Sequence, residues 1–318
     1  MHQTVYSIEP ISQESIKKIE TILVCSYCYV DRYSFLDRTD IHDNVKILIC
    51  RDRDAVSEII DCCRNLTFLF IVSTGVEKLP FEKLIKRNIL VANTGGINAP
   101  IMSEYAMAYI LSQSARVCEN LRNQLNGFWK KYQCVDSLAN QKLLIVGAGK
   151  TGQLLAHKAK AFEMKVVGIK KHVSKLKDFD EVDSLENIDR HLNEADFVVL
   201  TIPLTPETKG LFDYDRLKKM KKTSVLINIS RSRIVCQNDL IQALDEGVIG
   251  CAVLDVFDEE PLPTNNKMWQ MDNLIITPHS SGRLTDFMDK AMLYFIDNMK
   301  AFANKEPLPN KVDLNAGY

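Results

Sequence analysis

The 318-residue sequence lacks the features that mark several specialised classes of protein. Neither charge is in excess, since 40 lysines and arginines stand against 41 aspartates and glutamates, so a nucleic acid or an anionic membrane is not expected as the main partner. No apolar run approaches the roughly 18 residues that span a bilayer. The first residues lack the basic and then apolar segments of a secretory signal. We expect a soluble, cytoplasmic protein.

The sequence also lacks the cysteine spacing of a disulfide framework. Its nine cysteines are odd in number, and Cys62 and Cys63 are adjacent, so a reducing compartment is expected. Cys25 and Cys28 form a C-x-x-C motif that could be a redox pair or half of a zinc site. A zinc site needs a second ligand pair, which Cys62 and Cys63 cannot supply at their spacing. We favour the interpretation that the cysteines are small buried residues, and we expect no metal.

What the sequence does contain is an alternation of short apolar runs and amphipathic stretches, which is typical of α/β folds with parallel sheets. The length favours two domains. Strands are expected at 45–50, 67–72, 89–92, 143–146, 165–169, 197–202, 225–229, 251–254 and 274–277. Helices are expected at 54–64, 79–87, 99–115, 151–162, 185–193, 213–219, 237–246 and 287–303. Residues 118–140 are polar without a clear period and predict an extension or linker.

A glycine-rich turn, Gly147-Ala148-Gly149-Lys150-Thr151-Gly152, follows one predicted strand and opens a helix. In this context the first glycine permits a tight turn, the second lets backbone approach a pyrophosphate, and the third allows close packing of helix and strand. The helix N-terminus adds N–H groups and a positive dipole. The motif therefore predicts a dinucleotide-binding fold. A P-loop is excluded, because Leu144 stands in mid-strand where that motif needs a glycine.

The residues after the next strand concern the choice of cofactor. A fold that binds the ribose 2′-hydroxyl of NAD places an acidic residue there. The sequence has Lys170, Lys171 and His172, with no acidic residue between Lys165 and Lys177. Two lysines would attract a 2′-phosphate, so NADP is favoured over NAD. The alternative is that both are solvated surface charges.

Three later strands run into reactive side chains. Arg231, Glu260 and His279 follow the strands at 225–229, 251–254 and 274–277, and the carboxyl ends of parallel strands converge on a ligand-binding crevice. A guanidinium can hold a carboxylate at two points and polarise the neighbouring carbonyl. An imidazolium can donate a proton as hydride reaches the carbonyl carbon, and a paired carboxylate stabilises it. The set predicts carbonyl reduction. The histidines expected to be structural are His157, His172 and His191.

These segments resemble the signatures of the D-isomer-specific 2-hydroxyacid dehydrogenases over nearly the whole chain. Beside the glycine turn, the matching segments are 202–208 (IPLTPET), 227–231 (INISR), 254–262 (LDVFDEEPL) and 276–279 (ITPH). The resemblance implies an oxidoreductase that interconverts a 2-oxoacid and a D-2-hydroxyacid with NAD(P). It implies that Arg231 binds the substrate carboxylate and carbonyl, that His279 is the acid/base, and that Glu260 pairs with His279.

The resemblance further implies two doubly wound parallel-sheet domains. Residues 1–98 and 287–318 would form a discontinuous, flavodoxin-like substrate-binding domain, and residues 99–286 a Rossmann cofactor domain. The loop at 72–76 would grip the carboxylate, with Gly95, Gly96 and Asn98 near the hinge and cleft. The implied substrate contacts are Thr74, Gly75, Gly96, Arg231 and His279. The implied cofactor contacts are Gly147, Gly149, Lys150, Thr151, Gly152, Lys170, Lys171, Pro203, Thr208, Ile229, Arg231, Asp255, His279 and Gly282. Family members are commonly homodimers, and 118–140 would be the contacting extension.

Two departures from the family pattern stand out. Lys170 replaces the aspartate of NAD-using members, and Ser232 follows the arginine where glycine is usual. We expect a 2-oxoacid reductase. Glyoxylate, hydroxypyruvate, pyruvate and bulkier oxoacids all stay open as substrates, and phosphohydroxypyruvate is less favoured because no regulatory domain follows residue 318. The alternative is a nucleotide-sensing corepressor or scaffold of the same fold, which would keep the same three residues. The absence of a low-complexity tail favours the enzyme.

Overall fold

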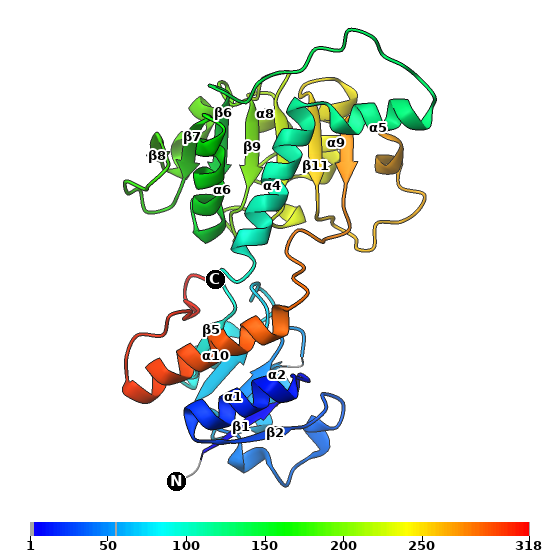
Figure 1. The fold of residues 1–318 in the computed structure, drawn as a ribbon. Coiled ribbons are helices and arrows are strands. Elements are labelled where there is room, and N and C mark those ends of the chain that lie inside the picture. Colours follow the sequence, from blue (N-terminus) through cyan, green and yellow to red (C-terminus); the bar gives the residue numbers. More distant parts are fainter. Residues whose placement is uncertain (1–2, 55, 318) are drawn as a thin grey trace. The chain divides into compact units, whose positions relative to one another are not determined.

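The computed structural model describes residues 3–54 and 56–317. The chain forms two compact units, one made of Met1–Ile97 with Leu284–Tyr318 and the other of Asn98–Arg283 (Figure 1). The sequence predicted domain boundaries at 98/99 and 286/287. Each unit is built on a parallel sheet with helices on both faces, so the predicted α/β class is confirmed. Among the described residues, no helix is long and apolar enough to cross a membrane.

The first unit has a five-stranded sheet in the order β2-β1-β3-β4-β5, and its neighbouring strands are parallel. The strands are β1 (Thr4–Ser7), β2 (Ser26–Tyr29), β3 (Ile47–Cys50), β4 (Phe68–Ile71) and β5 (Leu90–Asn93). The helices are α1 (Gln13–Leu23), α2 (Val56–Cys62), α3 (Phe81–Lys86) and α10 (Phe287–Asn304). Every residue of β3 and β4 is buried, because helices cover both faces of these strands. Phe70 of β4 packs against Phe295 of α10, with ring centroids 5.3 Å apart.

The second unit has a seven-stranded parallel sheet in the order β12-β11-β10-β9-β6-β7-β8. The strands are β6 (Lys142–Val146), β7 (Lys165–Ile169), β8 (Glu181–Asp183), β9 (Phe197–Leu200), β10 (Val225–Asn228), β11 (Cys251–Leu254) and β12 (Leu274–Ile276). The helices are α4 (Ala99–Ser114), α5 (Val117–Leu125), α6 (Lys150–Ala161), α7 (Ile188–Leu192), α8 (Tyr214–Leu217) and α9 (Gln237–Asp245). Helices α4 and α6 cover one face, and α7, α8 and α9 cover the other (Figure 1). The order of the strands reverses at β6, and such a switch point is where open parallel sheets bind ligands.

Most predicted elements differ from the observed ones only at their ends, and the strand at 165–169 matches β7. The sequence did not predict β1, α1, β2 and β8, nor the helix α5. Strand β2 lies at the edge of its sheet and has no buried residue, so its sequence lacks the apolar run of an interior strand. Strand β8 is a three-residue edge strand with two acidic residues. Helix α1 did carry a signal, because Ser12 caps it by accepting a hydrogen bond from the Ser15 N–H.

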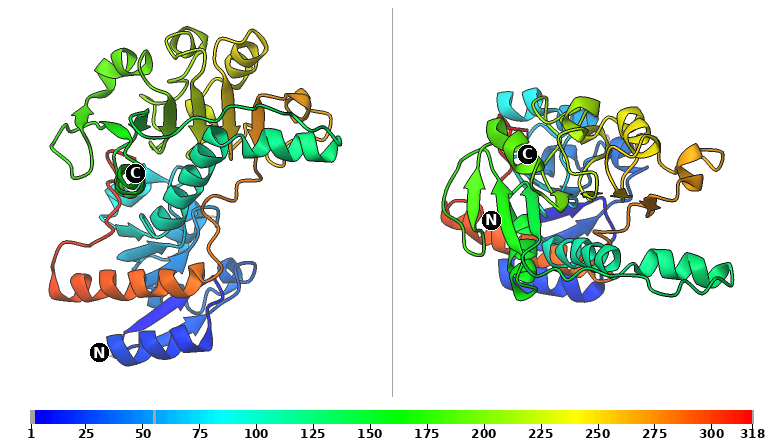
Figure 2. Two further views of the ribbon diagram at one scale, coloured as in Figure 1. Left: turned by 45° about the horizontal axis from the view of Figure 1, so that its top comes forward. Right: turned by 90° about the horizontal axis from the view of Figure 1, so that it is seen from above.

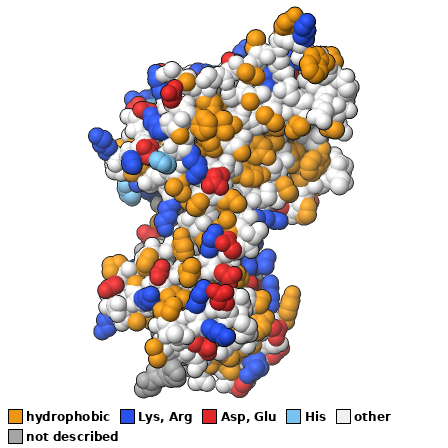
Figure 3. All heavy atoms as spheres, viewed as in Figure 1, with side chains coloured by type: hydrophobic (Ala, Val, Ile, Leu, Met, Phe, Trp, Pro, Cys, Tyr) orange, Lys and Arg blue, Asp and Glu red, His pale blue; other side chains and the backbone are white. Residues whose placement is uncertain are grey.

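The sequence predicts an extension or linker at 118–140, and the structure adds a helix, α5, in the first part of this segment. Helix α5 contains no buried residue, so it lacks the buried apolar face that usually reveals a helix. The helix and the segment after it project from the rest of the second unit (Figure 2, right). The exposed apolar side chains of this projecting arm are Val117, Leu121, Leu125, Phe128, Trp129, Tyr132 and Val135. On the face that Figure 3 shows, hydrophobic side chains gather over α4 and α5.

All nine cysteines are free thiols. The interpretation as buried residues is correct for Cys25, Cys50 and Cys63. It is wrong for Cys134, which is exposed on the projecting arm, while the remaining five are partly buried.

Candidate active site

The glycine turn after β6 has the geometry of a phosphate-binding turn. Gly147 adopts a φ of +110°, and a Cβ there would lie 2.6 Å from the Ile202 backbone nitrogen, so no side chain fits. A Cβ on Gly152 would lie 2.4 Å from the Gly147 oxygen, because α6 packs directly against the turn. A Cβ on Gly149 would have no neighbour within 4 Å, which leaves open space beside the backbone there. The three glycines thus suit the three tasks expected of them.

Helix α6 begins at Lys150, which is followed by Thr151. Gly149 occupies the N-cap position, and because it has no side chain it makes no capping hydrogen bond to the first N–H groups. The first N–H groups of a helix have no partner inside the helix and carry a positive partial charge. The turn in front of them is held from both sides. The Ala148 N–H donates to the Ile169 oxygen at 3.0 Å, and the Thr201 hydroxyl donates to the Gly147 oxygen at 2.7 Å. These residues fit the pyrophosphate of a dinucleotide.

The two lysines predicted to contact the cofactor lie directly after β7. Lys170 is partly buried, and its backbone N–H donates to the Asp183 oxygen of β8 at 2.9 Å. Lys171 is exposed, and its Nζ lies 3.2 Å from Glu207 Oε2 in the loop after β9. The sequence analysis did not foresee this ion pair. It means that one of the two cations already has an acidic partner.

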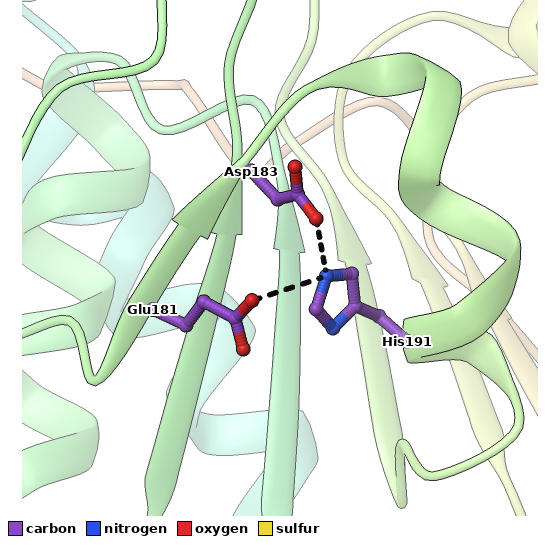
Figure 4. A group of neighbouring side chains, drawn as sticks. All are labelled: Glu181, Asp183 and His191. Carbon is purple, nitrogen blue, oxygen red and sulfur yellow. Dashed lines mark hydrogen bonds and ion pairs between the residues drawn. The ribbon is translucent and has the colours of Figure 1, made fainter.

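A buried carboxylate lies next to these lysines, at the end of β8. Figure 4 shows Glu181, Asp183 and His191 pointing toward one another, with His191 Nε2 3.0 Å from Asp183 Oδ2 and 4.0 Å from Glu181 Oε1. Hydrogen bonds from Asn187 and His191 hold the pKa of Asp183 well below its usual range. The arrangement resembles a three-ligand metal site, but the Arg190 guanidinium lies 2.7 Å from Asp183 Oδ2 and also contacts Glu181. We assign an ion-pair network, in which His191 has the structural role expected of it.

The loop after β9 contains two further residues predicted to contact the cofactor. Pro203 is exposed, whereas Thr208 is buried. The Thr208 hydroxyl donates to the Pro203 oxygen at 2.7 Å and accepts from the Thr205 N–H at 2.8 Å. The Thr208 hydroxyl therefore makes its hydrogen bonds within the loop and stabilises the loop's conformation. Any contact of Thr208 with a cofactor stays a prediction.

Arg231 lies in a turn that follows β10 and is fixed by a buried asparagine. Asn228 Oδ1 accepts from the Ser230 N–H at 3.1 Å, and Asn228 Nδ2 donates to the Arg231 oxygen at 3.0 Å. The Arg231 guanidinium donates to the Ser230 oxygen at 2.9 Å. Ser232, which replaces the usual glycine, opens a short 3-10 helix and leaves Arg231 extended, at a φ of −137°. Ile229, another predicted cofactor contact, has its side chain in the core, so only its backbone can face a ligand.

Glu260 and His279 come together after β11 and β12, the two strands that follow β10 in the order of the sheet. Glu260 Oε2 lies 2.8 Å from His279 Nδ1, and Glu260 Oε1 accepts from the Phe257 N–H at 2.9 Å. A carboxylate at Nδ1 holds the ring in one orientation and leaves Nε2 to exchange a proton with a ligand. The side chains are 50% exposed for His279 and 36% exposed for Glu260, so both are open to solvent-borne molecules. The structure thus brings together two of the three residues predicted as catalytic.

The loop that carries His279 is anchored by Asp255, which is fully buried at 0% exposure. Asp255 Oδ1 accepts from the Thr277 hydroxyl at 2.7 Å and from the Ser280 N–H at 2.8 Å. Asp255 Oδ2 accepts from the Ser281 N–H at 2.9 Å. These donors lie on both sides of His279, whose φ is +49°. The sequence analysis proposed Asp255 only as a cofactor contact. An acidic residue directly after a fully apolar strand was the signal for this anchoring role.

The first unit has its own group of predicted ligand-binding residues, in the loops after β4 and β5. Asn93 links the two loops, because its Nδ2 donates to the Thr74 oxygen at 2.9 Å and its Oδ1 accepts from the Gly95 N–H at 2.9 Å. The Ser73 hydroxyl donates to the Gly75 oxygen at 2.7 Å, and Gly96 adopts a φ of +95°. Thr74, Gly75 and Gly96 therefore share one edge of the five-stranded sheet.

Comparisons with known proteins agree with this geometry. The family described as D-isomer specific 2-hydroxyacid dehydrogenase, NAD binding domain, matches residues 107–281. The chain is 32% identical to the glyoxylate reductase/hydroxypyruvate reductase of Homo sapiens over 277 residues, 84% of each chain. It is 31% identical to the glyoxylate reductase of Pyrococcus horikoshii over 264 residues, which are 80% of this chain and 79% of that protein.

A solved structure extends the likeness to both units. The D-isomer specific 2-hydroxyacid dehydrogenase family protein of Aeromonas salmonicida subsp. salmonicida A449 has a TM-score of 0.83 and 30% sequence identity. The match covers 99% of this chain and 100% of that one. These comparisons give no support to the corepressor alternative. The chain belongs to the D-isomer-specific 2-hydroxyacid dehydrogenase family and is an NAD(P)-dependent oxidoreductase that acts on the CH–OH group of its donors.

Proposed function

We propose that this protein reduces a small 2-oxoacid to the D-2-hydroxyacid and that NADPH is its preferred hydride donor. Glyoxylate and hydroxypyruvate are the proposed substrates, since relatives that share about a third of its residues are named for reducing them. The observation that carries the proposal is the Glu260–His279 pair, 2.8 Å apart, whose residues follow the first and second strands beyond the one that leads to Arg231.

The proposed mechanism assigns one task to each of these side chains. The Arg231 guanidinium binds the substrate carboxylate and polarises the adjacent carbonyl. His279 donates the proton from Nε2 to the carbonyl oxygen, and Glu260 stabilises the imidazolium from which that proton leaves. The bound dinucleotide supplies the hydride. One oxoacid, one NADPH and one proton yield one hydroxyacid and one NADP⁺. Contacts of Thr74, Gly75 and Gly96 with the substrate, and a cytoplasmic location, belong to the same proposal.

The preference for NADPH rests on the absence of an acidic residue after β7. A carboxylate at that position would repel a 2′-phosphate, whereas Lys170 and Lys171 stand there instead. A charge-assisted hydrogen bond contributes about 1.5–3 kcal/mol, or about ten- to a hundredfold in affinity.

A spectrophotometric screen tests both parts of the proposal. Glyoxylate, hydroxypyruvate, pyruvate and phosphohydroxypyruvate are each assayed with NADH and with NADPH at low ionic strength, with His279→Ala as the inactive control. We expect the highest kcat/KM with NADPH and with one of the first two acids. No oxoacid turnover with either cofactor contradicts the proposed reaction, and NADH equal to or better than NADPH contradicts the cofactor preference.

We also propose that the second unit forms a homodimer through the projecting arm of α5 and the residues that follow it. Trp129 is 88% exposed and Tyr132 is 85% exposed. Such a cluster of exposed aromatic rings is unusual on the surface of a monomeric protein. A second copy would bury them. Light scattering at micromolar concentration should give the mass of a dimer, and a Leu121→Asp/Trp129→Asp variant should give that of a monomer. A monomeric mass for the unaltered protein contradicts the proposal.

A further inference from the structure

The ion pair between Lys171 and Glu207 connects two loops that lie on opposite sides of the glycine turn. Strand β6 stands between β7 and β9 in the sheet, and the glycine turn follows β6. Lys171 follows β7, and Glu207 lies in the loop after β9, yet Lys171 Nζ lies 3.2 Å and 3.4 Å from the two carboxylate oxygens of Glu207. The pair therefore links the loops that flank the predicted binding site of the dinucleotide.

We propose that Glu207 is a specificity-determining residue, which weakens recognition of the 2′-phosphate by competing for Lys171. This inference rests on the proposed use of NADPH. A 2′-phosphate that binds Lys171 must replace the Glu207 carboxylate as its partner, and it must also tolerate the negative charge that stays nearby. NADH makes no such demand, because its ribose carries a neutral hydroxyl at this position and the ion pair can persist. Glu207 thus lowers affinity for NADPH and leaves affinity for NADH almost unchanged.

The surroundings of the pair support a role in ligand recognition. Lys171 is 58% exposed and Glu207 is 66% exposed, so neither side chain contributes to the core and both can exchange partners. The loop after Lys171 adds His172, Lys175 and Lys177, all exposed, which makes Glu207 an acidic contact on an otherwise basic segment. Exposed ion pairs are weak, so a phosphate can displace this one. The expected effect on affinity is therefore about two- to fivefold.

The experiment measures the dissociation constants of NADPH and NADH from the fluorescence of the reduced nicotinamide, without any oxoacid, at low ionic strength. The variant is Glu207→Gln, which removes the charge and keeps the shape. The matched control is Glu194→Gln, since Glu194 forms an exposed ion pair with Lys142 at the opposite, amino-terminal edge of β6. We expect Glu207→Gln to bind NADPH about two- to fivefold more tightly and NADH as before. The control should change neither constant.

A second series shows whether Glu207 acts through Lys171. Lys171→Ala should weaken NADPH binding, and adding Glu207→Gln to it should recover less affinity than the same change gives in the unaltered protein. Unchanged or weaker NADPH binding by Glu207→Gln overturns the inference, because Glu207 would then be inert or would position Lys171 for the phosphate. Failure of the proposed function is a separate result. The proposed use of NADPH fails if the unaltered protein binds NADH as tightly as NADPH or more tightly. The role of Glu207 is judged separately, by the change in the NADPH dissociation constant between the unaltered protein and Glu207→Gln. Melting curves verify that each variant is folded. If Glu207→Gln does not fold, Glu207→Ala is measured in its place.

Discussion

Replacing Asp255 by asparagine is the most direct test of how His279, the proposed proton donor, is positioned. The Asp255 carboxylate accepts two backbone N–H groups, from Ser280 on one oxygen and from Ser281 on the other. An asparagine has a single acceptor oxygen, so in either orientation one of these N–H groups faces the amide NH₂. A buried donor left without an acceptor costs about 1–3 kcal/mol. For a domain of the size of the second unit, each kcal/mol lowers the melting temperature by about 2–4 °C, which gives a decrease of about 2–12 °C.

The same change should affect catalysis more than binding. His279 lies between Thr277 and Ser280, both of which are held by Asp255, and a catalytic group displaced by about 1 Å can lose about a hundredfold in rate. We expect Asp255→Asn to lower kcat by about ten- to a hundredfold, with a much smaller change in the dissociation constant of the cofactor. The control is Asp258→Asn, since Asp258 is an exposed acidic residue in the same segment. Calorimetry and steady-state kinetics at pH 7 measure both quantities. A melting temperature and a kcat within error of the control would refute the reasoning.

Three further predictions follow from the site and its neighbours. His279→Ala should lower kcat by about 10²–10⁴-fold while the cofactor still binds; an undiminished rate rules out His279 as the acid. Arg231→Lys should raise KM and lower kcat with little change in cofactor affinity, because an ammonium cannot make the planar two-point contact; normal kinetics would make Arg231 structural. Asp183→Asn should destabilise the protein. The pKa of Asp183 is lower in the folded state than in the unfolded state. The stabilisation that its carboxylate provides is therefore complete above the unfolded pKa, which is about 4, and it is lost as the pH falls through the folded pKa. Urea denaturation should therefore show a larger difference between Asp183→Asn and the unaltered protein at about pH 5 than below about pH 4; an equal difference at the two pH values contradicts this role for Asp183.

The parts of the molecule that the sequence predicted well are those where one local rule governs the structure. The glycine turn was predictable because a side chain at Gly147 or Gly152 would clash with neighbouring backbone, so glycine is required at both positions of this spacing. The meeting of Glu260 and His279 was predictable because both follow apolar strands whose carboxyl ends share an edge of a parallel sheet.

The parts that were missed depend on contacts between distant segments. The Lys171–Glu207 pair joins loops that follow two strands that are not neighbours, and the sequence around either residue gives no sign of the other. Helix α5 contains no buried residue, so it lacks the pattern of buried positions that usually predicts a helix. The anchoring of the His279 loop needs Asp255 and Ser281 to meet across 26 positions of the sequence.

The discontinuous first unit has a consequence for the synthesis of the protein. Ile49 and Phe70, in the middle of its sheet, pack against Phe295 and Met299 of α10, and Val312 donates to the Val91 oxygen at the edge of β5. Residues 98–283 must therefore leave the ribosome before the sheet of Met1–Ile97 receives the part of its cover that α10 provides, a delay of about 10–40 s at ordinary rates of translation. At the end of that interval the second unit has its complete sequence and can fold alone, while the part of the first sheet that α10 will cover is still open to chaperones. A chain that terminates after Arg283 never acquires the missing layer, so we expect such fragments to be cleared by proteases or to aggregate.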